Sequence, residues 1–149
     1  MRAKITPLKI DTFHVVKSVL EFISMVPENT VSVDDLFASY PIEIDFNHYQ
    51  SDSLIKVEMN IFVNAKKKQP GYKIEVKSEG YFKIDSEGLN ESQLFNLQVI
   101  STTSIMINNI RNIMSQLTAF APIGVYILPT IDINNLINEK AKQAERQHQ

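Results

Sequence analysis

The sequence contains no cysteine and little glycine or histidine, and each shortage excludes a class of chemistry. Without cysteine the chain has no disulfide, thiolate metal site or cysteine nucleophile, and it suits a reducing compartment. The four glycines are isolated from one another, so no glycine-rich phosphate-binding loop is present. The histidines, His14, His48 and His148, have no partner at the spacing of a metal site. Catalysis therefore has few residues on which to rest.

The remaining candidates for catalysis are pairs of carboxylates, and their pattern favours a structural role. Asp34 and Asp35 are adjacent, and Glu43 and Asp45 lie on the polar side of an expected strand. Such pairs transfer protons only where a cleft shifts their pKa values, whereas turns and solvated strand edges carry them routinely. The Gly-x-Ser-x-Gly turn of serine hydrolases is absent as well. We therefore expect a protein that is not an enzyme and that needs no cofactor and no metal.

Length and charge indicate a single domain over residues 1–149. A chain of this size can bury roughly two-thirds of its unfolded surface, and its hydrophobic content of 44% is near the globular average. A net charge of -2 offers no general attraction to nucleic acid. No apolar run approaches the ~20 residues of a membrane span, and the N-terminus lacks the apolar segment of a signal peptide. The sequence predicts a soluble, cytoplasmic protein without nucleic acid or membrane insertion.

The first half of the chain has the period-two alternation of β-strands and predicts an antiparallel sheet over about residues 8–85. The first strand is long, with a bulge expected near Lys17. Gly80 interrupts the last strand, and a glycine there indicates a bulge or a close approach of another backbone. The expected strands are 8–26, 42–47, 54–65 and 72–84.

The second half has helical periodicity. Residues 91–118 follow Asn90, a suitable N-cap, and contain no glycine or proline. A helix over 132–144, capped by Asp132, is expected to close the chain. Strands before helices indicate an α+β fold, in which a four-stranded antiparallel sheet packs the long helix and the short C-terminal helix on one face. The polar face of the long helix is either solvated or packed on another helix, and it carries Ser101, Ser104, Asn108, Arg111 and Ser115.

The connection between the helices, residues 119–131, is strongly apolar yet contains Pro122, Gly124 and Pro129. Proline disrupts both helix interiors and central strands, so we expect an ordered but irregular segment. Loops are usually polar and exposed, so an apolar connection must cover its own sheet or be covered by a partner. The strands also carry apolar side chains on both faces, and monomers rarely leave large apolar patches bare. The sequence predicts oligomerisation, a groove for apolar partners, or both.

Two blocks of the sequence resemble the SecB family of protein-export chaperones. Residues 72–84 contain a Glu-Val pair, a glycine and an aromatic-rich strand, as that family does. Residues 127–132 with Leu136 resemble its Leu-x-Pro-x-Asn-Phe-x-x-Leu block, although Ile131-Asp132 stands in place of the Asn-Phe pair. The expected order of strands, long helix, connection and closing helix extends the resemblance over almost the whole chain. The resemblance implies a divergent SecB-like protein.

This resemblance implies an ATP-independent chaperone that binds unfolded preproteins in hydrophobic grooves during export. It also implies a homotetramer, a dimer of dimers, whose interface would include Ser101, Ser104, Asn108 and Arg111. Of the acidic positions that dock the SecA translocation motor in the family, Glu75 matches one. The client-binding groove implied by position is lined by Tyr40, Ile42, Ile44, Phe46, Ile123, Val125, Ile127, Leu128 and Leu136.

Two other functions stay open at this point. The protein could be a dedicated chaperone of one partner such as an antitoxin, since relatives of SecB include chaperones of toxin–antitoxin systems. It could also be a small-molecule-binding or enzymatic α+β domain whose apolar connection covers a pocket. Chaperone action would need no ATP, because a groove that binds only the unfolded state holds a client open by mass action.

Overall fold

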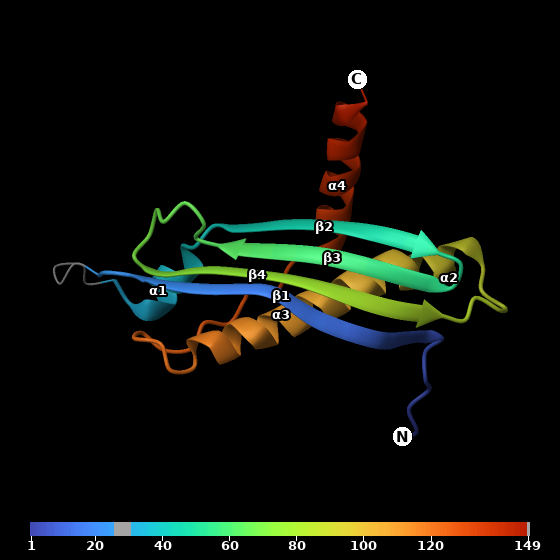
Figure 1. Cartoon of the computed structure of the whole chain (residues 1–149), viewed down its shortest axis with the longest axis horizontal. Helices are drawn as coiled ribbons and strands as arrows, with labels where there is room; N and C mark the ends of the chain where they lie inside the picture. The colour runs from blue at the N-terminus through green and yellow to red at the C-terminus, as the bar shows by residue number, and fades with distance from the viewer. Residues whose placement is uncertain (26–30, 149) are drawn as a thin grey trace.

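Figure 1 shows the computed structural model of the chain, which describes residues 1–25 and 31–148. Its described strands form one antiparallel sheet in the order β1-β4-β3-β2, and a long helix crosses one face of this sheet. The strands are β1 (Leu8–Ile23), β2 (Ile42–Ser51), β3 (Leu54–Val63) and β4 (Gly71–Ile84). The helical elements are α1 (Val33–Ala38), α2 (Glu91–Phe95), the π-helical η1 (Asn96–Ser101), α3 (Thr102–Thr118) and α4 (Ile133–Gln147). The predicted α+β class is confirmed.

The boundaries of β1 and the helix α1 differ from the sequence prediction. The strand expected at 8–26 ends at Ile23, and position 26 lies outside the described residues. Helix α1 was not predicted, and Asp34 and Asp35 occupy its first turn. Ser32 caps this helix, because its hydroxyl oxygen accepts a hydrogen bond from the Asp35 N–H at 3.2 Å. Carboxylates stabilise a helix N-terminus, which gives the acidic pair a structural role.

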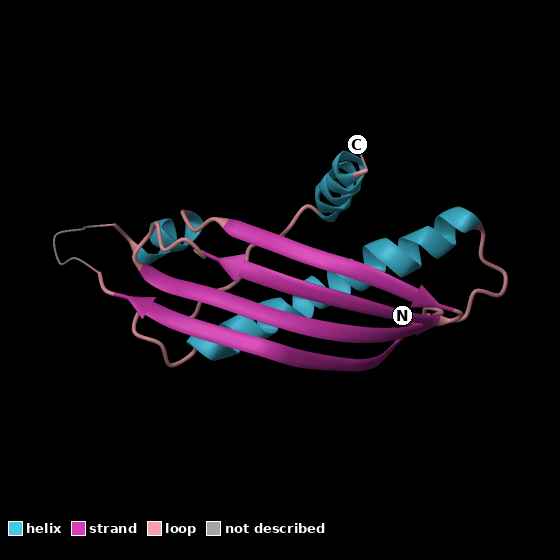
Figure 2. Ribbon diagram, turned by 45° about the horizontal axis from the view of Figure 1, so that its top comes forward, coloured by secondary structure: helices cyan, strands magenta, loops and turns pink. Residues whose placement is uncertain are grey.

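The core lies between the middle strands and α3, which crosses them obliquely (Figure 2). At Gly80 the missing side chain leaves room for Met106 of α3, since a Cβ atom there would lie 2.4 Å from the Met106 sulfur. The close neighbour of Gly80 is thus a side chain and not the other backbone that the sequence predicted. The bulge predicted near Lys17 is also present, as a register shift between Val15 and Lys17 in the β1–β4 pairing. The buried core side chains of β3 and α3 are Ile55, Val57, Met59, Ile61, Val63, Met106, Ile107, Ile110 and Met114.

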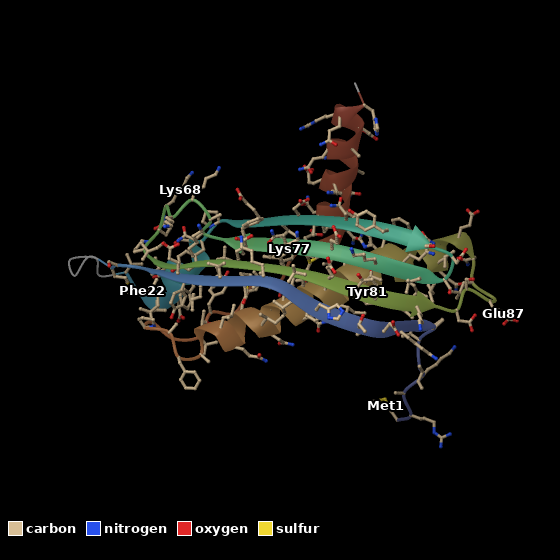
Figure 3. All side chains as sticks on the ribbon, viewed as in Figure 1. Met1, Phe22, Lys68, Lys77, Tyr81 and Glu87 are labelled. Atoms are coloured by element: carbon tan, nitrogen blue, oxygen red, sulfur yellow. The ribbon has the colours of Figure 1, made fainter. Side chains whose placement is uncertain are left out.

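The opposite face of the sheet carries ion pairs in place of a helix layer. Lys56 and Glu58 are 2.7 Å apart on β3, and Lys17 of β1 lies 3.0 Å from Glu75 of β4. Tyr81 stands on this face as well (Figure 3). Because both signs of charge alternate across the strands, this face presents neither a broad acidic nor a broad apolar surface.

Helix α4 packs on the sheet with its first half only. It starts beside the helix-covered face and extends past the edge strand β2 (Figure 1). Ile133, Leu136 and Ile137 contact the core, whereas residues 141–148 are all exposed. Beyond Lys140 the sequence offers only alanine, amide and charged side chains, so there is no apolar face to bury. None of the described helices is long and apolar enough to cross a membrane.

Candidate functional site

The apolar connection forms an extended segment with two different faces. Tyr126 and Leu128 are fully buried, whereas Val125 is 47% and Ile127 65% exposed. This alternation is that of an extended chain, although the segment belongs to no regular strand or helix, as predicted. The connection therefore covers its own sheet with every second residue and offers the others to solvent.

Arg111 of α3 holds the far end of this connection. Its Nε donates a hydrogen bond to the Leu128 carbonyl at 2.7 Å, and a terminal guanidinium nitrogen donates to the Pro129 carbonyl at 3.0 Å. The other terminal nitrogen donates to the Asn108 side-chain oxygen. Hydrogen bonds from a charged donor are stronger than neutral ones, and the planar guanidinium fixes the direction of both carbonyls. Arg111 thus aligns the connection along the helix.

Two further side chains of α3 continue this contact one and two turns along the helix. Thr118 accepts a hydrogen bond from the Tyr126 N–H at 2.8 Å through its hydroxyl oxygen. Ser115 donates its hydroxyl to the Tyr126 carbonyl at 3.4 Å. Both backbone groups of Tyr126 therefore face α3. The polar stripe on the long helix serves, in this chain, as the partner of an extended backbone.

The near end of the connection is fixed by the sheet. Tyr72 of β4 donates its hydroxyl to the Gly124 carbonyl at 2.8 Å and accepts a hydrogen bond from the Ile123 N–H at 3.0 Å. Gly124 adopts a φ of +92°, a conformation that glycine reaches without strain. This turn directs the chain back along α3, so the sheet and the helix together define where the connection runs.

An aromatic cluster lies beneath the buried side of the connection. The Phe37 ring of α1 is 5.3 Å from that of Tyr126 and 5.7 Å from that of Tyr72, measured between centroids. Tyr40 joins it, with its hydroxyl accepting a hydrogen bond from the Tyr72 N–H at 2.9 Å. Burial raises the pKa of Tyr126, whose hydroxyl has no hydrogen-bond partner within the described residues. The connection is anchored here through large apolar contacts.

The nine residues predicted to line a groove are divided by the structure among three environments. Tyr40, Phe46 and Leu128 belong to the buried core, where a partner cannot reach them without rearrangement. Val125 and Ile127 are exposed. The half-buried remainder, which packs against the core, comprises Ile42, Ile44, Ile123 and Leu136. The accessible apolar surface at this site is consequently smaller than the predicted groove.

The residues predicted for an oligomer interface lie on one side of α3 and η1. Ser104, Asn108 and Arg111 line a depression together with Thr130 and Ile131 at the end of the connection. Ser101, in η1, is half-buried. Because Arg111 bonds the connection, part of this polar face is already used within the chain. Its role between subunits stays a prediction.

Glu75, the predicted docking position for a motor, is an ion-paired side chain on the outer face of the sheet. Its carboxylate lies 3.0 Å from the Lys17 ammonium and accepts a hydrogen bond from the Asn60 amide at 3.2 Å. Burial raises the pKa of Glu75, but hydrogen bonds from Lys17 and Asn60 and the positive charges of Lys17 and Lys73 outweigh it and leave the pKa below its usual range. A partner that bound Glu75 would have to displace these contacts.

His48 is a structured residue whose role the sequence did not indicate. Its Nε2 lies 3.1 Å from the Thr102 hydroxyl and 3.3 Å from that of Thr103, where β2 meets the start of α3. Burial lowers the pKa of His48, and the positive charge of Lys140 lowers it further. Nothing in the spacing of a lone histidine marks such a contact.

Within residues 1–25 and 31–148, no group of histidine and carboxylate side chains could hold a metal ion.

An exposed apolar strip lies on β1, and the sequence did not single out its residues. Ile10, Val15, Val16 and Phe22 are all exposed, although they lie in a strand of the sheet. Helix α3 packs on β3 and β4, so it leaves the flank of β1 uncovered. The signal was present as a long apolar strand at a sheet edge, but strand order cannot be read from alternation alone.

The sequence matches no protein-family model and no curated protein. The structure is similar to several solved structures, among them the following two. A protein of unknown function from Streptococcus agalactiae has a TM-score of 0.50 at 10% identity, over 86% of this chain and 100% of that chain. The SecB-like chaperone Rv1957 of Mycobacterium tuberculosis, in complex with a peptide from the antitoxin HigA1, has a TM-score of 0.48 at 10% identity, over 85% of this chain and 91% of that one.

The chain shares its α+β fold with the Streptococcus agalactiae protein. Its strands, long helix, extended connection and closing helix follow the order that the sequence resemblance implies. At 10% identity the likeness concerns the fold alone. The function of this chain must therefore be argued from its own surface.

Proposed function

We propose that the protein is an ATP-independent chaperone that binds non-native polypeptides through the solvent-facing side of its apolar connection. The observation that carries this proposal is the exposed pair Val125 and Ile127, presented on a backbone that α3 and the sheet hold in place. Removing apolar surface from water gains about 25 cal/mol per Å², with little dependence on sequence. Folded proteins bury such segments, so this surface selects unfolded ones.

The test is aggregation of a slowly folding client in the presence of the protein. At stoichiometric amounts we expect the aggregation to be delayed. The variant Val125→Asp with Ile127→Asp should abolish this delay while leaving the melting temperature nearly unchanged, because both side chains are exposed. Leu128 is unsuited to this test, since charging a buried side chain would unfold the protein.

Phe95→Asp is the matched control for that variant. Phe95 is also an exposed large apolar residue, and it lies in α2, away from the connection. We expect this variant to retain full activity. If neither the unaltered protein nor the control delayed aggregation, the proposed function would be wrong. If both charged variants lost activity equally, general surface hydrophobicity would explain the effect.

For assembly we propose the homotetramer, a dimer of dimers, that the resemblance to SecB implies. The exposed strip on β1 supports it, because it is an apolar surface that the single chain leaves uncovered. The mass in solution tests this directly against 17.0 kDa for one chain. A mass four times as large supports the tetramer, and a monomer at micromolar concentration contradicts it.

The resemblance supports a cytoplasmic role in preprotein export for such a chaperone, with unfolded preproteins as its clients. Docking to the SecA motor through Glu75 would require breaking the ion pair with Lys17. The variant Lys17→Ala should therefore strengthen binding of SecA if Glu75 takes part. Unchanged binding, or none, would remove Glu75 from that role.

A dedicated chaperone of one partner, such as an antitoxin, is the second candidate. It is favoured by the small accessible surface, because three of the nine predicted groove residues are buried and only two are exposed. A short surface suits one short segment better than a long wrapped client. Competition separates the candidates, since unrelated unfolded proteins should displace a client from a general chaperone but not from a dedicated one.

A further inference from the structure

The extended connection has one backbone edge bound and the other edge free. Tyr126 directs its N–H to Thr118 and its carbonyl to Ser115, both on α3. In an extended chain the two backbone groups of one residue point to the same side, and those of its neighbours point to the opposite side. Val125 and Ile127 therefore direct their backbone groups away from α3. Within the described part of the chain, neither residue makes a backbone hydrogen bond.

The same two residues carry the exposed side chains of the segment. Val125 and Ile127 thus offer unpaired backbone groups and aliphatic surface at one place. Pro122 and Pro129 flank them, and proline has no N–H to donate. The free edge is consequently short, and it is held straight from the other side by α3. A strand edge of this kind is a template on which another extended chain can pair.

The outer edge of β2 is the other candidate for such pairing, and it is less suitable. Lys140 of α4 reaches across this edge to Asp45, with 3.2 Å between the ammonium and carboxylate. Its ammonium also lies 5.5 Å from the centre of the Phe46 ring on the opposite face of the strand. An incoming strand would displace this side chain along the middle of β2. Val125 and Ile127, at the free edge of the connection, are both exposed.

We propose that the free edge of the connection captures an extended segment of a non-native polypeptide by β-strand addition. The client strand pairs its backbone with Val125 and Ile127, and its alternate apolar side chains lie beside theirs. The pairing proposed is antiparallel, in which a residue bonds the one directly opposite and both project to the same face, so the client residues that bond are also those that contact the aliphatic pair. This inference rests on the proposed function and names its substrate class, which is segments with apolar residues at every second position.

Binding by β-strand addition explains how the protein could recognise many unfolded polypeptides and still exclude folded ones. Backbone groups are common to all polypeptides, so pairing demands no particular sequence. Native proteins have already paired these groups internally, which excludes them. Proline at a pairing position of the client lacks the donor and should be rejected. The surface therefore selects an extended backbone with apolar residues at every second position, and it does not select a particular amino-acid sequence.

The test uses a short fluorescent peptide of alternating valine and alanine, with lysines at both ends for solubility. One analogue carries N-methyl groups on its valines and a second carries them on its alanines, so each loses the donors of one edge only. Binding to the full-length protein is measured by fluorescence anisotropy. We expect the valine-methylated analogue to bind at least about tenfold more weakly than the parent, and the alanine-methylated one to bind like the parent.

Ile127→Pro supplies a matched test from the protein side, because it removes one outer donor and keeps an apolar side chain. We expect this variant to bind the parent peptide more weakly than the unaltered protein does, whereas Ile127→Val should bind it like the unaltered protein. If both analogues bind the unaltered protein equally, or the alanine set is the weaker, β-strand addition is wrong while chaperone activity can stand. If the parent peptide does not bind and aggregation is not delayed, the proposed function itself fails. Release of a second copy of this chain by the peptide would overturn the inference by assigning the free edge to self-association.

Discussion

Single residues decide where the connection lies, and Arg111 contributes most to this. From the sequence it belonged to a polar face that could be solvated or shared between helices. The structure gives it two backbone carbonyl partners that are 17 and 18 residues further along the chain. No periodicity predicts such a contact, because the acceptors are main-chain atoms of a segment without regular structure. The side chain acts as a positioning residue for the exposed aliphatic pair.

Replacing Arg111 by alanine should loosen the connection and lower stability. It leaves the carbonyls of Leu128 and Pro129 without their charged donors. Hydrogen bonds to charged groups contribute about 1.5–3 kcal/mol, and partial solvent access places this loss near the lower end, at about 1–2 kcal/mol. Urea unfolding at fixed protein concentration measures it. Asn112→Ala, at an exposed neighbouring position on α3, is the control. An unaltered free energy of unfolding for the Arg111 variant would contradict this role.

His48 should make stability depend on pH in acid solution. Burial and the charge of Lys140 lower its pKa in the folded protein below the ordinary value of 6.5. Between the folded pKa and 6.5 the unfolded state binds more protons, so stability rises with pH and falls as pH drops through 6.5. Once the pH is below the folded pKa the full loss is present.

The measurement is the free energy of unfolding at a series of pH values on either side of 6.5. His48→Gln keeps a donor near Thr102 and Thr103 but cannot take up a proton. We expect its stability to depend less on pH than that of the unaltered protein over this range. An equal pH dependence in both proteins would show that another group titrates.

At the scale of elements, the sequence predicted what local periodicity can encode. The alternation of Val57, Met59 and Ile61 is a local property, and it gave the sheet correctly. The capping box of Asn90 with Gln93 likewise gave the start of the long helix. Helix α1 was missed because its six residues are too short for a helical period to appear. Which residues of the connection are buried could not be predicted. Their orientation depends on hydrogen bonds between side chains of α3 and the backbone of the connection, which are far from local in sequence.

Helix α4 divides into a packed half and a projecting half, and this division predicts the effect of truncation. Ending the chain after Lys140 removes a segment in which residues 141–148 are all exposed, so we expect the free energy of unfolding to change by less than about 1 kcal/mol. Ending it after Asp132 also removes Ile133, Leu136 and Ile137 from the core. Each of these half-buried side chains contributes about 1 kcal/mol or more, so the second truncation should cost several kcal/mol. Equal losses in the two truncations would mean that the projecting half is packed in solution.

For the whole molecule, function rests on surfaces that a single chain leaves unused. The outer face of the sheet carries paired charges of both signs, whereas the flank of β1 and the solvent side of the connection are apolar. Apolar surface of this kind favours association. The flank of β1 is suited to a second copy of the chain. The connection, with its free backbone edge, is suited to a client.

Site-specific photo-crosslinking tests whether the solvent-facing side of the connection contacts an unfolded client. A photoreactive side chain is placed at Ile127 in one variant and at Phe95 in another, and each is irradiated with the same client in its folded and its unfolded form. We expect a crosslink from position 127 to the unfolded client only, and little or none from position 95, although both positions are exposed. Crosslinking at 95 as strong as at 127, or equal crosslinking to the folded client, would contradict the account.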